Sequence, residues 1–189
     1  MDKFTFKIVD NQKLLEDVFA FRHTILEEVY PEYAQKYVQD GCDYDKYDTY
    51  AKHLVALNKE GAICATVRLI YNSPIGYPTQ NSMKFDTTKF QNEKIGEISR
   101  IFIAKEYRNL RDTKIIIEGF KKILYAIMKE LNITYTYGAL EKKFLRLLKM
   151  YKMDYEVIGD VQEYKFVGMR YPVGLHTKQF GEVNNYETL

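Results

Sequence analysis

The feature that most constrains the fold is the order of strand-like and helix-like segments along the chain. Short apolar or alternating runs predict strands at 3–9, 52–57, 62–71, 95–103 and 133–138. Helical periodicity runs through 12–29, 112–131 and 140–152, and a closing strand or hairpin is expected within 154–170. This order predicts an α/β fold with a mixed central sheet and helices on both faces.

Local signals mark the boundaries of the first elements. Asp10 and Asn11 are suited to cap the first helix, and Pro31 is expected to end it. The turn Asn58-Lys59-Glu60-Gly61 joins two strands as a hairpin. The polar, tyrosine-rich segment 32–50 is expected to be loop or short helix, and 72–94, with Pro74, Gly76 and Pro78, mainly loop.

Length and composition fit one domain spanning residues 1–189. No segment approaches the roughly 20 apolar residues of a membrane span, and the first residues lack a signal-peptide pattern, so the expected location is cytoplasmic. A net charge of +2 gives no indication of nucleic-acid binding. Cys42 and Cys64 are expected to be reduced thiols, and the scattered histidines predict no metal site.

Charged residues stand where the pattern calls for apolar ones. Arg22 falls in the apolar stripe of the first helix, and Arg68 lies inside a strand that is apolar on both faces. Glu97 and Arg100 lie within the apolar strand 95–103. An unpaired buried charge costs several kcal/mol, so these side chains need partners or water.

Two interpretations of these charges remain open. The three arginines can form a structural ion-pair network with Glu97, Asp45 and Asp48. They can also line a polar cavity at the middle of the sheet that binds a charged substrate, because perturbed ionisable groups gather at functional sites. A network can line a cavity, so the two interpretations are compatible.

Strand periodicity places Glu97 and Ser99 on one face of the sheet, and Arg100 on the other unless a bulge intervenes. If their face opens to a cleft, Glu97 is the candidate general base. A carboxylate with a raised pKa can accept the proton of an amine directly or through water.

A basic segment follows the same strand and leads into the long helix. Its cationic side chains are Lys105, Arg108, Arg111 and Lys114. A helix N-terminus with added arginines favours a phosphate or an acidic partner, although an ordinary solvated turn is the alternative. The run YRNLRDTK holds no glycine, so a glycine-built phosphate cradle is not expected.

Together these motifs resemble a known enzyme family. The chain resembles the acyl-homoserine lactone synthases in five motifs. These are Phe21-Arg22, the Asp43-to-Asp48 loop (D-x-D-x-x-D), Thr66-Val67-Arg68-Leu69, Phe85 and Glu97-Ile98-Ser99-Arg100. The resemblance is greater to the long-chain N-acyl amino acid synthases. Both groups are GNAT-like acyltransferases. The motifs cover about residues 15–110, and from there to about 170 the likeness rests on element order.

The resemblance implies roles for individual residues. Glu97, Ser99 and Arg100 form the expected catalytic group. The residues expected to bind or surround the substrates are Arg22, Asp45, Asp48, Arg68, Phe85, Phe102 and Ile103. The implied donor is an acyl-phosphopantetheine thioester on acyl carrier protein or coenzyme A, with no permanently bound cofactor. An acidic carrier suits Lys105, Arg108, Arg111, Lys114, Lys121 and Lys122, and the pantetheine arm is expected where strands 95–103 and 133–138 splay apart.

The departures from the family pattern refine the expected substrates. Asp43 stands where the lactone synthases usually carry Glu, and the chain has no tryptophan. Both differences favour an amino acid over S-adenosylmethionine as acceptor. The missing glycine-rich loop favours a carrier-protein donor over coenzyme A.

The leading hypothesis is therefore N-acylation of an amino acid by a medium-to-long acyl thioester. Glu97 acts as base, backbone N–H groups near Phe102 and Ile103 stabilise the oxyanion, and Arg68 or Arg100 holds the acceptor carboxylate. A lactone synthase is the alternative within the family. A non-catalytic module that binds a carrier protein or a lipid is the alternative from another class.

Overall fold

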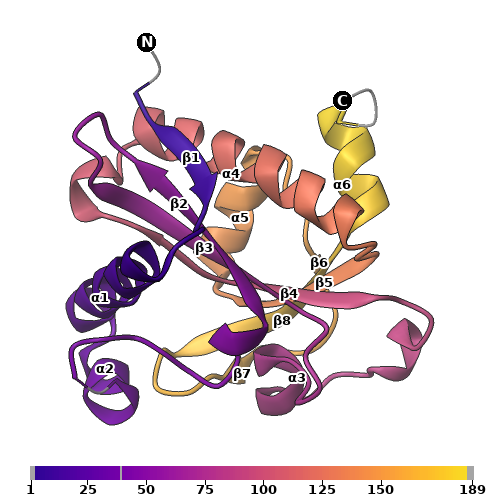
Figure 1. Cartoon of the computed structure of the whole chain (residues 1–189). Helices are drawn as coiled ribbons and strands as arrows, with labels where there is room; N and C mark the ends of the chain where they lie inside the picture. The colour runs from indigo at the N-terminus through magenta and orange to yellow at the C-terminus, as the bar shows by residue number, and fades with distance from the viewer. Residues whose placement is uncertain (1–2, 39, 187–189) are drawn as a thin grey trace.

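The computed structural model describes residues 3–38 and 40–186, and a twisted mixed sheet runs through its centre (Figure 1). The strands are β1 (Thr5–Ile8), β2 (Ala51–Leu57), β3 (Ile63–Tyr71), β4 (Ile95–Ile103), β5 (Tyr135–Leu140), β6 (Glu156–Val157), β7 (Gln162–Glu163) and β8 (Met169–His176). Their order is β1-β2-β3-β4-β5-β8-β6, with β7 paired to β8. The pairs are antiparallel except β4–β5, which is parallel. The predicted mixed sheet is confirmed.

The helices cover both faces of this sheet, as expected. They are α1 (Gln12–Val29), α2 (Pro31–Tyr37), α3 (Pro78–Ser82), α4 (Leu110–Glu130), α5 (Lys142–Met150) and α6 (Thr177–Asn184). Val18 and Phe19 of α1 pack on Val55 of β2. The neighbouring Leu54 faces the other way, into a core built with α4, α5 and α6. The alternation of β2 therefore separates the two layers.

Most element boundaries match the sequence predictions. The first helix and the strand at 95–103 lie where they were expected, and Asn11 caps α1 by accepting the Leu14 N–H. Pro31 not only ends α1 but also begins α2, because its fixed φ suits the first turn of a helix.

The prediction for the C-terminal part was only partly right. A small hairpin lies within 154–170, where β7 pairs with the first two residues of β8. The long closing strand, β8, runs on to His176, beyond the predicted range. Pro172 and Gly174 lie within β8 and interrupt the pattern by which a strand is predicted. Helix α6 was not predicted.

Candidate active site

A V-shaped gap opens in the sheet between β4 and β5. Their parallel pairing covers only Ile95, Gly96 and Glu97, opposite Tyr135, Thr136 and Tyr137. Beyond Glu97 the strands diverge, and a cavity of about 370 Å³ lies between them. Ile101, Phe102 and Ile103 line one side, and Leu140 and Phe144 line the other. The expected splaying of these two strands is confirmed, with Glu97 at the closed end of the gap.

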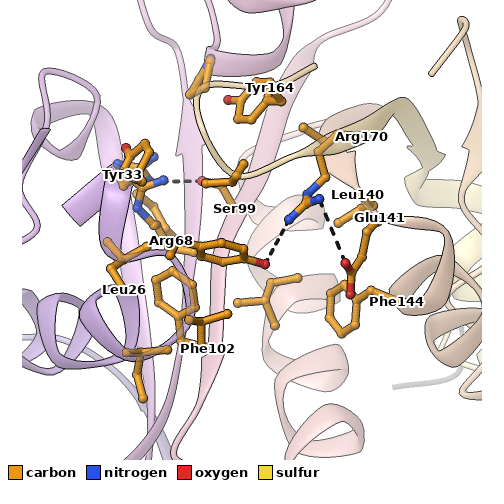
Figure 2. A pocket seen from close by; sticks show the side chains of 18 of the residues that line it. Leu26, Tyr33, Arg68, Ser99, Phe102, Leu140, Glu141, Phe144, Tyr164 and Arg170 are labelled. Atoms are coloured by element: carbon orange, nitrogen blue, oxygen red, sulfur yellow. Dashed lines mark hydrogen bonds and ion pairs between the residues drawn. The ribbon is translucent and has the colours of Figure 1, made fainter. Parts of the chain in front are cut away.

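The walls of the cavity are largely apolar. Polar and charged side chains lie at its closed end and also in its open part, where Arg108, Glu141 and Arg170 line it. Figure 2 shows Leu26 and Phe102 on one side and Leu140 and Phe144 on the other, with Arg68, Ser99 and Tyr33 at one end. Such a shape accommodates an extended ligand with an apolar body and a polar reacting end.

A β-bulge in β4 brings Arg100 to the same side as Glu97 and Ser99. Arg68 pairs with Ser99 and Thr66 pairs with Phe102, so two residues of β4 face Val67 alone. Arg100 has a positive φ of 52°, a conformation that is uncommon for a side chain with a Cβ atom. The bulge removes the expected separation of Glu97 and Arg100, and all three side chains line the cavity.

Three arginines and three aspartates form a closed ring of ion pairs beside the cavity. Arg22 binds Asp43 at 2.7 Å and Asp48 at 2.8 Å. Arg68 binds Asp45 at 2.8 Å and Asp48 at 3.0 Å. Arg100 binds Asp43 at 2.7 Å and Asp45 at 3.4 Å. Each arginine thus joins two aspartates, and the six charges sum to zero.

The ring stabilises its own charges. Burial disfavours the ionised carboxyl of Asp43, yet Arg100 and Arg22 lower its pKa to about 2. Burial likewise opposes the charge of Asp48, and Arg68 and Arg22 hold its pKa well below the ordinary range. The structural interpretation of these charges therefore holds for Arg22, which is fully buried and does not line the cavity.

Glu97 is not a member of this ring, contrary to the network that we considered. Its two carboxylate oxygens accept hydrogen bonds from the N–H and the hydroxyl of Thr79, both at 2.9 Å. Burial raises the pKa of Glu97 to about 7, against the opposing effect of these bonds. A carboxyl group poised near neutral pH is suited to take up and release a proton.

Arg68 has hydrogen-bonding capacity left over. Its Nε donates to Ser99 Oγ at 3.0 Å and its Nη1 to Asp45 at 2.8 Å. Its Nη2 is buried and has no hydrogen-bond partner. Since Arg68 lines the cavity and a buried donor is costly when unpaired, Nη2 is suited to bind an anionic group of a ligand.

The expected oxyanion donors lie too far from Glu97 for that role. Phe102 and Ile103 stand five and six positions further along β4, which is roughly 16–20 Å at about 3.3 Å per residue. The Ala104 N–H donates to Cys64 O at 2.8 Å, so alternation directs the Phe102 N–H toward β3 and the Ile103 N–H toward the gap. Both residues line the cavity, but far from Glu97.

The basic segment contains both paired and free cations. Arg108 lines the cavity, binds Glu28 at 3.0 Å and donates to Ile103 O at 2.7 Å. Lys105, Arg111, Lys114 and Lys122 are exposed. Lys121 is buried and held by Glu118 and by Tyr151 O, so its expected carrier contact was wrong.

Two further residues differ from expectation. Phe85 lies away from the cavity and packs edge-on against Tyr137, with ring centroids 5.3 Å apart. Asp43 was not among the expected site residues, yet it bonds to two arginines. The sequence did contain a signal for it. The D-x-D-x-x-D loop has three aspartates, one for each of the three arginines that need a partner.

The structure also brings together residues that carried no sequence signal. The side chains of Tyr30, Tyr33, Tyr164 and Arg170 line the cavity, and Thr79 holds Glu97. Among the described residues no cluster of His, Cys, Asp or Glu is arranged to hold a metal ion. No helix in the described ranges has the length and apolarity needed to cross a membrane.

Comparison with known families identifies the fold. Residues 21–118, more than half of the chain, match the acetyltransferase (GNAT) domain family. The chain belongs to this family. It is thus an acyltransferase by family, and the expected GNAT fold and enzyme class are confirmed. The matched residues include Arg22, Asp43, Arg68, Glu97 and Arg100. No curated protein sequence matches the chain.

Solved GNAT-like structures share the whole architecture. FeeM, an N-acyl amino acid synthase from uncultured soil microbes, has a TM-score of 0.69 at 13% identity over 95% of this chain and 93% of its own. The AHL synthase LasI has 0.69 at 14% identity over 95% and 93%. BjaI, a CoA-dependent acyl-homoserine lactone synthase, has 0.67 at 14% over 97% and 89%. At such low identity, the TM-scores and the coverage show a common fold and no more.

Proposed function

We propose that this GNAT protein is an N-acyltransferase that moves a medium-to-long acyl group from a thioester to the amine of an amino acid. The donor thioester is carried by acyl carrier protein or coenzyme A. The observation that carries the proposal is the closed end of the cavity, where Glu97 with a pKa of about 7 lies with Ser99 and the unpartnered Nη2 of Arg68.

In this proposal the acceptor lies at the closed end. Arg68 Nη2 binds its carboxylate, an interaction that a guanidinium makes well. Its amine loses a proton to Glu97, through water where the two do not touch. Arg100 has its Nε and Nη2 engaged with Asp43, Asp45 and Tyr33, so Arg68 is the better of the two expected carboxylate partners.

The donor occupies the gap between β4 and β5. The amine nitrogen attacks the thioester carbonyl carbon and the new N–C bond forms. The C–S bond then breaks, and the leaving thiolate takes up the proton that the amine gave to Glu97 and departs as the thiol. Ser99 Oγ accepts from Arg68 Nε, so its own hydrogen is free to stabilise the oxyanion. The Ile103 N–H and the apolar walls hold the donor arm.

The second candidate is a lactone synthase. It is favoured by the fold likeness to LasI, BjaI and TofI. Homoserine lactones in an organic extract of the expressing culture would distinguish it from amino-acid acylation. A non-catalytic module, the third candidate, predicts saturable carrier binding without turnover.

The test is expression of the protein and of Glu97→Gln in a bacterial host, followed by mass spectrometry of the culture extract. The proposal predicts new N-acyl amino acids with the wild-type chain and their near-complete loss with the variant. Equal product from the two chains would remove Glu97 as base. Homoserine lactones in place of N-acyl amino acids would favour the second candidate.

A further inference from the structure

Arg170 occupies a position in the cavity that the acyl-transfer proposal does not use. It is the second residue of β8, is 8% exposed and lines the same cavity as Glu97 and Phe102. Its Nη2 donates to the Tyr30 hydroxyl at 2.9 Å, and its Nη1 donates to Met169 O at 3.0 Å. Its nearest carboxylate, Glu141, is 3.9 Å away.

Arg170 spans the open part of the gap. Tyr30 follows α1, whose Leu26 and Val29 line one wall together with β4. Glu141 follows β5 and precedes α5 on the other wall. Figure 2 shows the Arg170 side chain between these walls, with dashed contacts to Glu141 and to the tyrosine hydroxyl opposite. An extended ligand that runs along the gap must pass this guanidinium.

The contacts of Arg170 differ from those of the buried arginines that hold the fold together. Arg22 binds two carboxylates at 2.7 and 2.8 Å. Arg170 holds one neutral hydroxyl, one neutral carbonyl and a distant carboxylate. Arg170 can exchange the tyrosine hydroxyl for the carbonyl oxygen of a ligand and keep its other contacts. The exchange therefore costs little free energy.

We propose that Arg170 is a binding residue for the donor arm and that Tyr30 holds its guanidinium in position while the gap is empty. When a pantetheine-type thioester enters, Arg170 Nη2 leaves Tyr30 and donates to an amide carbonyl of the arm. The Ile103 N–H serves the arm from the opposite wall. This inference rests on the proposed thioester donor and assigns a second anchor to it.

The test is steady-state kinetics with an acyl-pantetheine thioester and an amino acid, on the wild type, Arg170→Gln and Tyr30→Phe. Arg170→Gln loses a charged hydrogen-bond donor, so its KM for the thioester should rise by roughly tenfold. Its KM for the amino acid and its kcat at saturating thioester should stay unchanged. Tyr30→Phe removes the hydroxyl that accepts from Arg170 Nη2. The thioester then has no internal acceptor to displace, so its KM should fall. The opposite signs separate binding from a general loss of structure.

Three results would overturn the inference. One is a rise in the amino-acid KM of Arg170→Gln with an unchanged donor KM, and another is a loss of kcat alone. If Arg170→Gln does not fold, an unchanged or higher donor KM in Tyr30→Phe decides against it. A wild type that transfers no acyl group refutes the proposed function instead. Calorimetric binding of a thioether analogue of the donor then tests Arg170 separately.

Discussion

Glu97 and Arg68 lie on neighbouring strands and are both buried, but their hydrogen-bond partners differ. Those partners determine what each side chain can offer a substrate. Glu97 has both oxygens bonded to Thr79, which leaves it without a cation in hydrogen-bond contact and with a pKa of about 7. Arg68 is charged, fixed by Asp45 and Asp48, and has one donor unused. Periodicity identified both as buried, because each interrupts an apolar strand. It could not identify Thr79, which lies in the five-residue helix α3, too short to show a periodic pattern.

Glu97→Gln should be more stable than the wild type above pH 7. Burial raises the folded-state pKa of Glu97 from 4.5 to about 7, so its contribution to stability is complete below the unfolded pKa and is lost as pH rises through about 7. The amide variant avoids this loss, which is on the order of 3 kcal/mol. Urea unfolding at pH 8 and pH 5 should show a difference that shrinks at the lower pH. Equal stabilities at both pH values would contradict the burial argument.

Arg68→Lys should impair the recognition of amino acids specifically. The ammonium keeps the charge that the ring requires but loses the free Nη2 donor. We expect the KM for an amino acid to rise by roughly tenfold, whereas the KM for the corresponding decarboxylated amine stays within about twofold. The ratio of the two KM values is the measurement.

Arg22→Lys is the matched control, because Arg22 belongs to the same ion ring but does not line the cavity. It should lower the free energy of unfolding and leave the KM ratio unchanged. A ratio that changes equally in both variants would assign the effect to the ring and not to a carboxylate contact.

At the scale of elements, the ion ring fixes the segment 43–48 against one helix and two strands. Arg22 comes from α1, Arg68 from β3 and Arg100 from the bulge of β4. The sequence predicted that these charges need partners, but it placed Glu97 among them and omitted Asp43. The face of Arg100 was left to the presence or absence of a bulge. A bulge depends on the pairing of β4 with β3, and nothing within the strand's own residues shows it.

Asp43→Asn should destabilise the fold strongly. The change leaves Arg22 with Asp48 alone and Arg100 with only its longer contact to Asp45. Breaking buried ion pairs by removing one partner typically costs about 3–5 kcal/mol. Asp17→Asn, which breaks the exposed pair with Lys13, should change stability far less, because solvent screens the pair. Chemical denaturation of the two variants compares them, and similar losses would argue against a stabilising ring.

The same ring should make the protein sensitive to acid. The folded-state pKa of Asp43 is lowered from 3.8 to about 2, so its contribution is present above the unfolded pKa and is lost as pH falls through about 2. The free energy of unfolding should therefore fall between pH 5 and pH 2 in the wild type. Asp43→Asn should show a smaller decrease over this range.

At the scale of the whole molecule, the open end of the gap adjoins the basic segment, which runs from the end of β4 into the first turns of α4. Arg108 lines the cavity, and Lys105, Arg111 and Lys114 are exposed beside it in the sequence. The GNAT architecture was predictable because the strands and helices up to 150 follow their periodicities closely. The last strand, β8, was not, because Pro172 and Gly174 interrupt its pattern, and Arg170 was missed along with it.

Charge reversal of Lys105, Arg111 and Lys114 to Glu should slow transfer from a carrier-protein donor. Electrostatic steering of an acidic carrier predicts a decrease of at least about tenfold at low salt, with little change for free acyl-pantetheine. The matched control reverses Lys59, Lys89 and Lys178, which are exposed elsewhere. Equal effects of the two triple variants would refute docking at the basic segment.

The most direct test measures thiol release from an acyl thioester by the purified protein, with and without an amino acid, across pH 5–9. Release should require the amino acid, rise with pH through about 7 as Glu97 loses its proton, and be lost in Glu97→Gln. Release that proceeds without an acceptor, or that Glu97→Gln retains with the same pH profile, would contradict the proposed function.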